Sequence, residues 1–227
     1  MLISPEDDPP RRAADEALMR AVRARADLGP APSPDAEALA YRAAVDAAPD
    51  TVTLDLLRGV WGRLDASQRP SLAVHGPEAA LFAADRFGLN LRLTETAEAA
   101  LASVQGRSRA LIELDARPWW GRLLARPELR VAAAFPEARQ ARPRALLVSA
   151  ETTGPTGDDR TFWVTDSRLS EARIVDDLSR VGLPAEPLLA AGGLKLFVLA
   201  GYVQAEDGRL DGAPGDLSGV IGAAPQY

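Results

Sequence analysis

The chain has 227 residues, no cysteine and a formal net charge of −6 at pH 7. This length fits one large domain or two to three small ones, and 47% hydrophobic with 26% charged residues is typical of a soluble globular protein. The acidic balance excludes a general nucleic-acid binder, which would carry a basic domain. The absence of cysteine excludes disulfides, thiolate metal sites and a cysteine nucleophile.

The longest apolar runs, such as residues 194–200, are far shorter than the roughly 20 residues that a membrane span needs. The first twelve residues carry acidic residues and prolines rather than a basic segment followed by an apolar one, so they do not match a signal peptide. We therefore predict a cytoplasmic protein with no membrane or nucleic-acid partner. The sequence contains no phosphate loop, dinucleotide fingerprint, zinc spacing or nucleophile elbow, and we expect no metal and no cofactor.

Three short helices are predicted at the start of the chain, over residues 11–28, 35–48 and 53–66. Apolar residues in the first of them recur at the spacing of an amphipathic helix, and Arg25 is the next member of this stripe. A charged residue on the buried side of a helix is unusual. The helices are rich in alanine and bury little surface, so we expect residues 1–69 to need a partner, either a second chain or the rest of this one.

Strands and helices alternate after residue 70, which predicts a small α/β sheet unit over residues 70–150. The stretch 144–165 reads as a strand, a loop and a second strand, and we interpret it as a hinge. A βαββ order follows, with Gly192-Gly193 as the hairpin turn, in a unit over residues 151–227 whose tail offers only residues 217–221 for packing. The predicted fold class is α+β: three helices, a small α/β sheet unit and a C-terminal βαββ unit.

Three stretches resemble one family of enzymes. GPEAALFAADRFG, residues 76–88, is similar to the opening of prephenate dehydratase. TETAEAALASVQGRSRALIELD, residues 94–115, resembles a later segment of the same family, and the βαββ unit resembles an ACT regulatory module. With helices in front, the order is similar to the bifunctional chorismate mutase–prephenate dehydratase proteins, as a shortened and degenerate member.

The resemblance implies a chorismate mutase of aromatic amino acid biosynthesis, an isomerase that clamps a small dianion and needs no covalent step. It places Arg25 as the carboxylate clamp, with Glu37 and Gln68 as further catalytic residues. Arg11, or alternatively Arg12, would supply a second substrate-binding charge across a homodimer. The family's helix-1 lysine has no counterpart, and Ala36 stands at the position of a family arginine. Activity is therefore expected to be weak or lost, and the alternative is a non-catalytic small-molecule sensor or interaction protein on the same scaffold.

Each of these residues also has a structural interpretation, which the sequence leaves open. Arg25 near a helix C-terminus is favoured by the helix dipole and can form an ion pair with Glu37 or Asp27. Glu37 in the first turn of its helix is expected for the same electrostatic reason. Gln68 is placed where an exposed helix-end residue would lie. The sequence therefore leaves open whether the protein is an enzyme.

Overall fold

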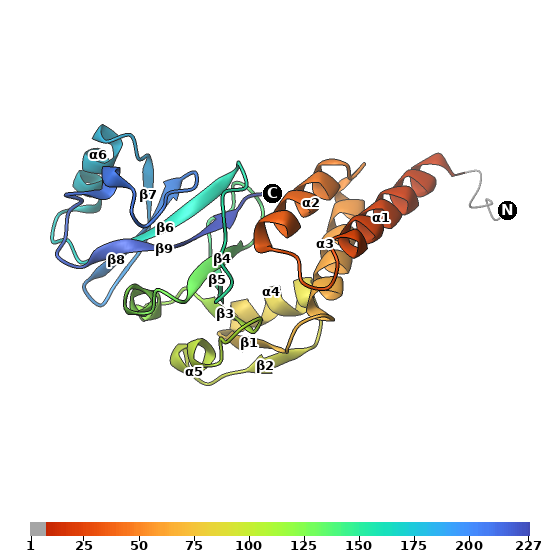
Figure 1. Cartoon of the computed structure of the whole chain (residues 1–227), viewed down its shortest axis with the longest axis horizontal. Helices are drawn as coiled ribbons and strands as arrows, with labels where there is room; N and C mark the ends of the chain where they lie inside the picture. Colours follow the sequence, from red (N-terminus) through yellow and green to blue (C-terminus); the bar gives the residue numbers. More distant parts are fainter. Residues whose placement is uncertain (1–7) are drawn as a thin grey trace.

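The computed structural model describes residues 8–227 (Figure 1). Residues 1–7, which belong to the stretch examined for a signal peptide, lie outside the described residues. The helices are α1 (Pro9–Asp27), α2 (Pro34–Asp46), α3 (Thr51–Ala66), α4 (Pro77–Phe87), α5 (Ala97–Ala102) and α6 (Glu171–Arg180), with 3₁₀ segments η2 (Trp119–Ala125) and η3 (Gly208–Leu210). The strands are β1 (Leu72–His75), β2 (Leu91–Leu93), β3 (Arg109–Glu113), β4 (Arg130–Phe135), β5 (Ala145–Ser149), β6 (Asp159–Thr165), β7 (Ala185–Ala191), β8 (Leu194–Ala200) and β9 (Ser218–Pro225).

One mixed sheet of nine strands runs through the described part of the chain, in the order β2-β1-β3-β5-β4-β9-β6-β8-β7. The β2-β1-β3 end is parallel, and antiparallel pairs dominate the remainder. The predicted fold class is wrong, because the α/β unit and the βαββ unit do not form separate sheets. The division into residues 1–69, 70–150 and 151–227 stays a prediction about how the chain is organised.

The two halves of the sheet are joined by β9, which lies between β4 and β6. Gly222 pairs with Val131 of β4 and has a φ of +137°. A Cβ at this position would overlap the backbone nitrogen and oxygen of Val131, so only glycine allows the approach. The small residues of β9 give no alternating apolar pattern, which is why the sequence predicted packing only for residues 217–221.

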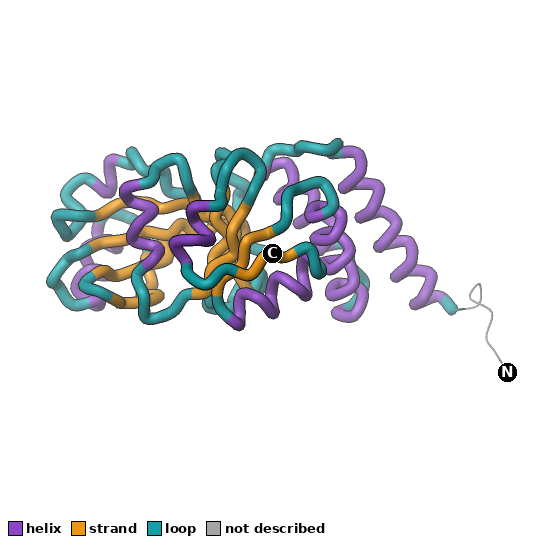
Figure 2. The backbone as a smooth tube through the Cα atoms, turned by 90° about the horizontal axis from the view of Figure 1, so that it is seen from below, coloured by secondary structure: helices purple, strands orange, loops and turns teal. Residues whose placement is uncertain are grey.

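Side chains alternate between the two faces of the sheet, and helices cover both. Val74 and Leu111 pack in the same cluster as residues of α4, whereas Ala73 and Ile112 pack on the opposite face with α5 and η2. At the other end of the sheet, Trp163 packs with α6. The sheet is therefore the middle layer of the molecule (Figures 1 and 2).

The helices α1, α2 and α3 gather at one end of the molecule, with α1 outermost (Figures 1 and 2). They pack around Tyr41, Leu57 and Trp61, and α3 also packs against α4. The rest of the chain thus covers part of this helical segment. Within residues 8–227, none of the helices combines the length and apolar character that crossing a membrane requires.

Two glycines of α3 provide a test of how closely α3 and α4 are packed. A Cβ at Gly62 would overlap the carbonyl oxygen of Arg86 on α4, whereas a Cβ at Gly59 would meet only the flexible end of the Arg63 side chain within about 3 Å. We expect Gly62→Ala to lower the free energy of unfolding by about 1–3 kcal/mol through overpacking. Gly59→Ala, its matched control, should raise it by about 0.5–1 kcal/mol, because alanine favours the helix. Urea unfolding of both variants measures this, and equal effects would contradict the packing described.

Candidate functional site

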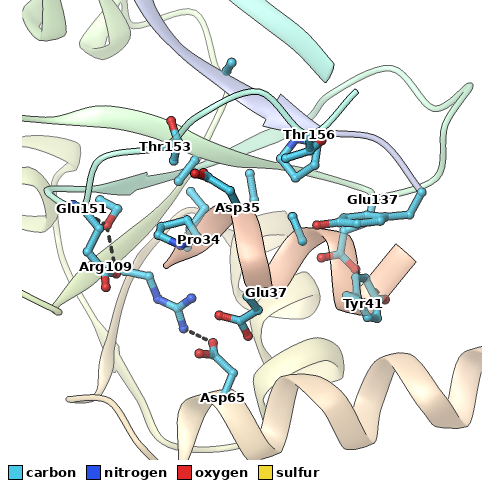
Figure 3. Close-up of a pocket in the computed structure, with 18 of the residues that line it drawn as sticks. Pro34, Asp35, Glu37, Tyr41, Asp65, Arg109, Glu137, Glu151, Thr153 and Thr156 are labelled. Atoms are coloured by element: carbon cyan, nitrogen blue, oxygen red, sulfur yellow. Dashed lines mark hydrogen bonds and ion pairs between the residues drawn. The ribbon is translucent and has the colours of Figure 1, made fainter. Parts of the chain in front are cut away.

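A polar cavity of about 90 Å³ lies on the face of the sheet that carries α4, beneath α2 and α3 (Figure 3). Its floor is formed by strands β4, β5 and β9, and its side by the loop of residues 150–158. The charged and hydroxyl-bearing residues in its lining are Asp35, Glu37, Tyr41, Asp65, Arg69, Arg86, Arg109, Glu137, Ser149, Glu151, Thr153, Thr156, Asp159 and Tyr227. The lining therefore holds charges of both signs.

Asp65 joins three elements around this cavity. It follows Leu57 and Trp61 at four-residue spacing, which turns it to the buried side of α3, and it is only 2% exposed. Its Oδ1 lies 2.7 Å from Nε of Arg69, and its Oδ2 lies 2.5 Å from Nη2 of Arg109 on β3. Nη2 of Arg25 on α1 lies 3.7 Å from the same Oδ1. One carboxylate thus links α1 and α3 to the sheet.

Glu37 enters the cavity from α2 and contacts two of the same arginines. Its Oε1 lies 3.4 Å from Nε of Arg25, and its Oε2 lies 3.8 Å from Nη2 of Arg69. The indole Nε1 of Trp61 donates a hydrogen bond to Oε1 at 3.3 Å. Figure 3 shows the Glu37 and Asp65 carboxylates next to each other, with Arg109 reaching Asp65 from the sheet side.

The two carboxyl groups have pKa values shifted in opposite directions. Burial raises the pKa of Glu37, the negative charge of Asp65 raises it further, and Arg25, Arg109 and Arg69 do not offset these effects. Burial also acts to raise the pKa of Asp65, but Arg109 and Arg69 outweigh it and hold that pKa below its ordinary value. The cavity therefore favours the protonated form of Glu37 and the ionised form of Asp65, each relative to the same group in water.

A second cluster closes the other end of the cavity. Nε of Arg86 lies 3.0 Å from Oε2 of Glu137, and the hydroxyl of Tyr41 donates to the same oxygen at 3.3 Å. The guanidinium of Arg86 lies 4.6 Å from the centre of the Tyr41 ring, and Tyr227 packs edge-on against that ring at 4.6 Å. Burial raises the pKa of Tyr41, so its hydroxyl stays protonated.

The loop of residues 150–158 is held over the cavity by ionic and polar contacts. Glu151 forms an ion pair with Arg69. Arg42 of α2 donates to the carbonyl oxygen of Thr156 at 2.6 Å and to that of Asp158 at 2.9 Å. The backbone nitrogen of Gly154 donates to Oδ1 of Asp35 at 2.5 Å. The stretch interpreted as a hinge thus forms one wall of the site.

Three of the four residues predicted as site residues lie together. Arg25 is 1% exposed and donates to Oε1 of Gln68 at 3.1 Å and to the carbonyl oxygen of Gly29 at 3.2 Å, in addition to its contact with Glu37. Arg11 lies fourteen residues earlier on α1, roughly 20 Å along the helix, and its exposed side chain is 4.0 Å from Asp15. The catalytic roles of Arg25, Glu37 and Gln68 and the substrate contact of Arg11 stay predictions.

Sequence reasoning missed eight charged residues of the cavity lining, and four of them form the cluster around Asp65: Asp65 itself, Arg69, Arg109 and Glu151. Asp65 carried the same signal as Arg25, a charge on the buried stripe of a helix. Arg109 and Glu151 had no such signal, because a strand end and a loop do not show in the sequence which helix they will face. Among residues 8–227, no group of three or more histidine and acidic side chains is arranged to hold a metal ion.

Comparison with known proteins adds little to this geometry. No family model matches the chain, and no curated protein is similar in sequence. The chain is similar to a solved structure described as "GqqA- a novel type of quorum quenching acylases", at 15% identity and a TM-score of 0.46, over 69% of this chain and 95% of that one. Likeness at this level supports no functional conclusion.

The resemblance to chorismate mutase–prephenate dehydratase proteins is wrong, and with it the expected function in aromatic amino acid biosynthesis. No family model matches, and within residues 8–227 the expected separate units are parts of one nine-stranded sheet. The stretches that carried the resemblance are short, and local structure explains their residues. Gly76-Pro77-Glu78 is the N-terminus of α4, where Glu113 caps the helix by accepting a hydrogen bond from the Glu78 nitrogen at 2.8 Å. The ACT-like stretch is one edge of the common sheet.

Replacement of Asp65 tests its role as the link between the helices and the sheet. Asp65→Asn leaves Arg25, Arg69 and Arg109 buried with less negative charge, so we expect it to lower the free energy of unfolding by about 3–5 kcal/mol. The matched control is Asp55→Asn on the same helix, whose exposed ion pair with Arg58 predicts a change within about 0.5 kcal/mol. Urea unfolding measures both. Similar small changes in the two variants would show that Asp65 does not hold the cluster.

The raised pKa of Glu37 predicts how stability depends on pH. The folded protein holds this proton more tightly than the unfolded chain, so the corresponding stability is fully present below about pH 4.5 and is lost as the pH rises through the folded pKa. Glutamine imitates the neutral carboxyl. As the pH rises above about 4.5, Glu37→Gln should therefore lose less stability than the parent protein, whereas exposed Glu98→Gln should follow the parent curve. Urea unfolding across this range measures the stability of the parent protein and both variants. A steeper loss of stability in Glu37→Gln than in the parent would contradict a raised Glu37 pKa.

Proposed function

We propose that the protein is an enzyme that catalyses proton transfer, with Glu37 as the proton donor to a small polar substrate group. One observation carries the proposal: two carboxyl groups line one cavity and share two arginines, yet their surroundings shift their pKa values in opposite directions. Such a separation assigns acid and base roles in several well-understood active sites. Perturbed carboxyl groups inside a cavity are candidates for catalysis for the same reason.

Each charged neighbour has a defined part in this chemistry. Burial and the negative charge of Asp65 both favour the protonated form of Glu37. Once Glu37 has given up its proton, the contacts with Arg25 and Arg69 stabilise the carboxylate that forms. That carboxylate can then accept a proton from water, so one residue serves as acid and then as base. Trp61 fixes the carboxyl orientation through its indole hydrogen bond.

The size of the cavity limits what can react there. A volume of about 90 Å³ holds a few water molecules, whereas pockets for drug-sized ligands measure roughly 300–1,000 Å³. The cavity therefore suits the reacting end of a molecule, such as an amide, ester or glycosidic oxygen that leaves more readily when protonated. Entry would pass the loop of residues 150–158, which forms the side wall.

A set of substrates with good and poor leaving groups tests the proposal. Simple amides, alkyl esters and alkyl glycosides need a proton on the leaving group, whereas p-nitrophenyl esters need it far less. We expect turnover of at least one class with poor leaving groups, and a loss of about 10²–10⁴-fold in Glu37→Gln. The loss should be much smaller for the p-nitrophenyl ester, and Glu98→Gln should retain activity on both.

Two results would overturn the proposal. One is the absence of turnover in the parent protein for every class of the set. The other is an equal loss in Glu37→Gln for good and poor leaving groups, which would assign Glu37 a structural role instead of proton donation.

The cytoplasmic location, the homodimer and a small dianionic partner were predicted from the sequence alone. They stay predictions, and the chemistry proposed for Glu37 depends on none of them. Size-exclusion chromatography with light scattering would test the homodimer.

A further inference from the structure

A much larger cavity, of about 650 Å³, lies on the opposite face of the sheet. Neighbouring residues of β6 divide the two sites: Asp159 lines the central cavity and Arg160 lines this one. Its walls are formed by the loop after β4, the start of β6 and the outer strands β7 and β8. The polar residues in its lining are Arg139, Gln140, Arg142, Arg160, Ser179, Glu186 and Gln226. This volume is in the range of small-molecule sites.

Arg160 in the wall of this cavity is a buried cation without a buried anion. It is 5% exposed, and among residues 8–227 it forms no ion pair. Its Nη1 donates to the carbonyl oxygen of Ala141 at 2.9 Å and its Nη2 to that of Pro136 at 3.4 Å, while its buried Nε has no hydrogen-bond partner. An arginine stays charged when it is buried, and a buried charge without a counter-ion is costly. The guanidinium in this wall therefore carries a positive charge that no carboxylate of residues 8–227 balances.

A second arginine in the lining, Arg142, is also without a carboxylate partner among the described residues. Arg142 donates to the carbonyl oxygen of Leu188 and, within the described chain, is in no ion pair either. Arg139 is exposed and is neutralised by Asp158 at 2.5 Å. Glu186, on the β7 wall, is the single acidic residue in the lining. Two arginines without carboxylate partners thus face one acidic residue across the cavity.

We propose that this cavity is a binding site for a small molecule with a carboxylate or phosphate group, held by Arg160 and Arg142. A guanidinium presents donors in a planar fork that matches the oxygens of both groups, and its hydrogen bonds to an anion are about twice as strong as neutral ones. Pro187 and Leu188 give the site an apolar side for the body of the molecule. Glu186 repels negative charge, which weakens the binding of a doubly charged group more than that of a singly charged one. The site is independent of Glu37 and of the chemistry proposed there.

Binding can be measured by thermal unfolding and calorimetry with two probes, inorganic phosphate and acetate, each against sodium chloride at equal ionic strength. We expect at least one probe to stabilise the parent protein beyond the salt control. Arg160→Met and Arg142→Met should each weaken binding about tenfold or more, because each removes a charge-assisted hydrogen bond. Glu186→Gln should strengthen it, because the repulsive charge is removed. Arg126→Met, which alters an exposed arginine paired with Glu128, should have no effect.

The pattern across variants separates binding from a structural role of Arg160. Arg160→Met removes an uncompensated buried charge, so in the absence of probe it should fold with stability at or above that of the parent protein. If that variant does not fold, Arg142→Met and Glu186→Gln still test the site, because both residues are exposed. The first substitution must weaken probe binding and the second must strengthen it. The proposal is overturned if neither probe acts beyond salt, or if affinity is unchanged in Arg142→Met and Glu186→Gln. Phosphate and acetate distinguish the two possible ligand groups.

Discussion

The carboxylate of Asp65 is the interaction on which the arrangement of the site depends. Arg25 comes from α1, Arg69 from the turn after α3 and Arg109 from β3, and all three converge on it. A single buried carboxylate among three guanidinium groups is stable only if further acceptors share the positive charge. Glu151, from the loop after β5, provides a second carboxylate for Arg69, and the carboxyl oxygens of Glu37 on α2 lie within 3.8 Å of Arg25 and Arg69. The contacts that attach the helices to the sheet are therefore the same contacts that set the charge state of the cavity.

The sheet provides the surface on which this cluster is assembled. Because β9 joins β4 to β6, the loop of residues 150–158 is held at both ends by strands of one sheet. The close approach at Gly222 thus has an indirect effect on the cavity, through the position of Glu151 and Thr156. The same sheet separates the central cavity from the arginine-lined one, with Asp159 and Arg160 facing opposite ways. Two sites of different size and charge are in this way supported by one element.

Local sequence signals predicted part of this structure. The three N-terminal helices were predicted within two residues of their observed ends, since amphipathic spacing and helix-ending residues are local signals that act over one or two turns. The buried charge at Arg25 was visible because helical periodicity shows which residues face inward. The joining of two expected units into one sheet was not predictable, because it rests on β9, a strand of small residues whose pairing is set by distant partners. Arg109 and Glu151 were missed for the same reason: their roles come from contacts across the fold.

A carbon-13 NMR titration of the Glu37 side-chain carboxyl measures directly whether burial and the charge of Asp65 raise the pKa of Glu37. We predict a Glu37 pKa above the ordinary 4.5, with the Asp65 carboxyl titrating below its ordinary 3.8. A Glu37 pKa at or below 4.5 would show that the arginines outweigh burial and the charge of Asp65. Glu37 would then be the anion of a structural ion-pair cluster, and the proposed proton donor would not exist.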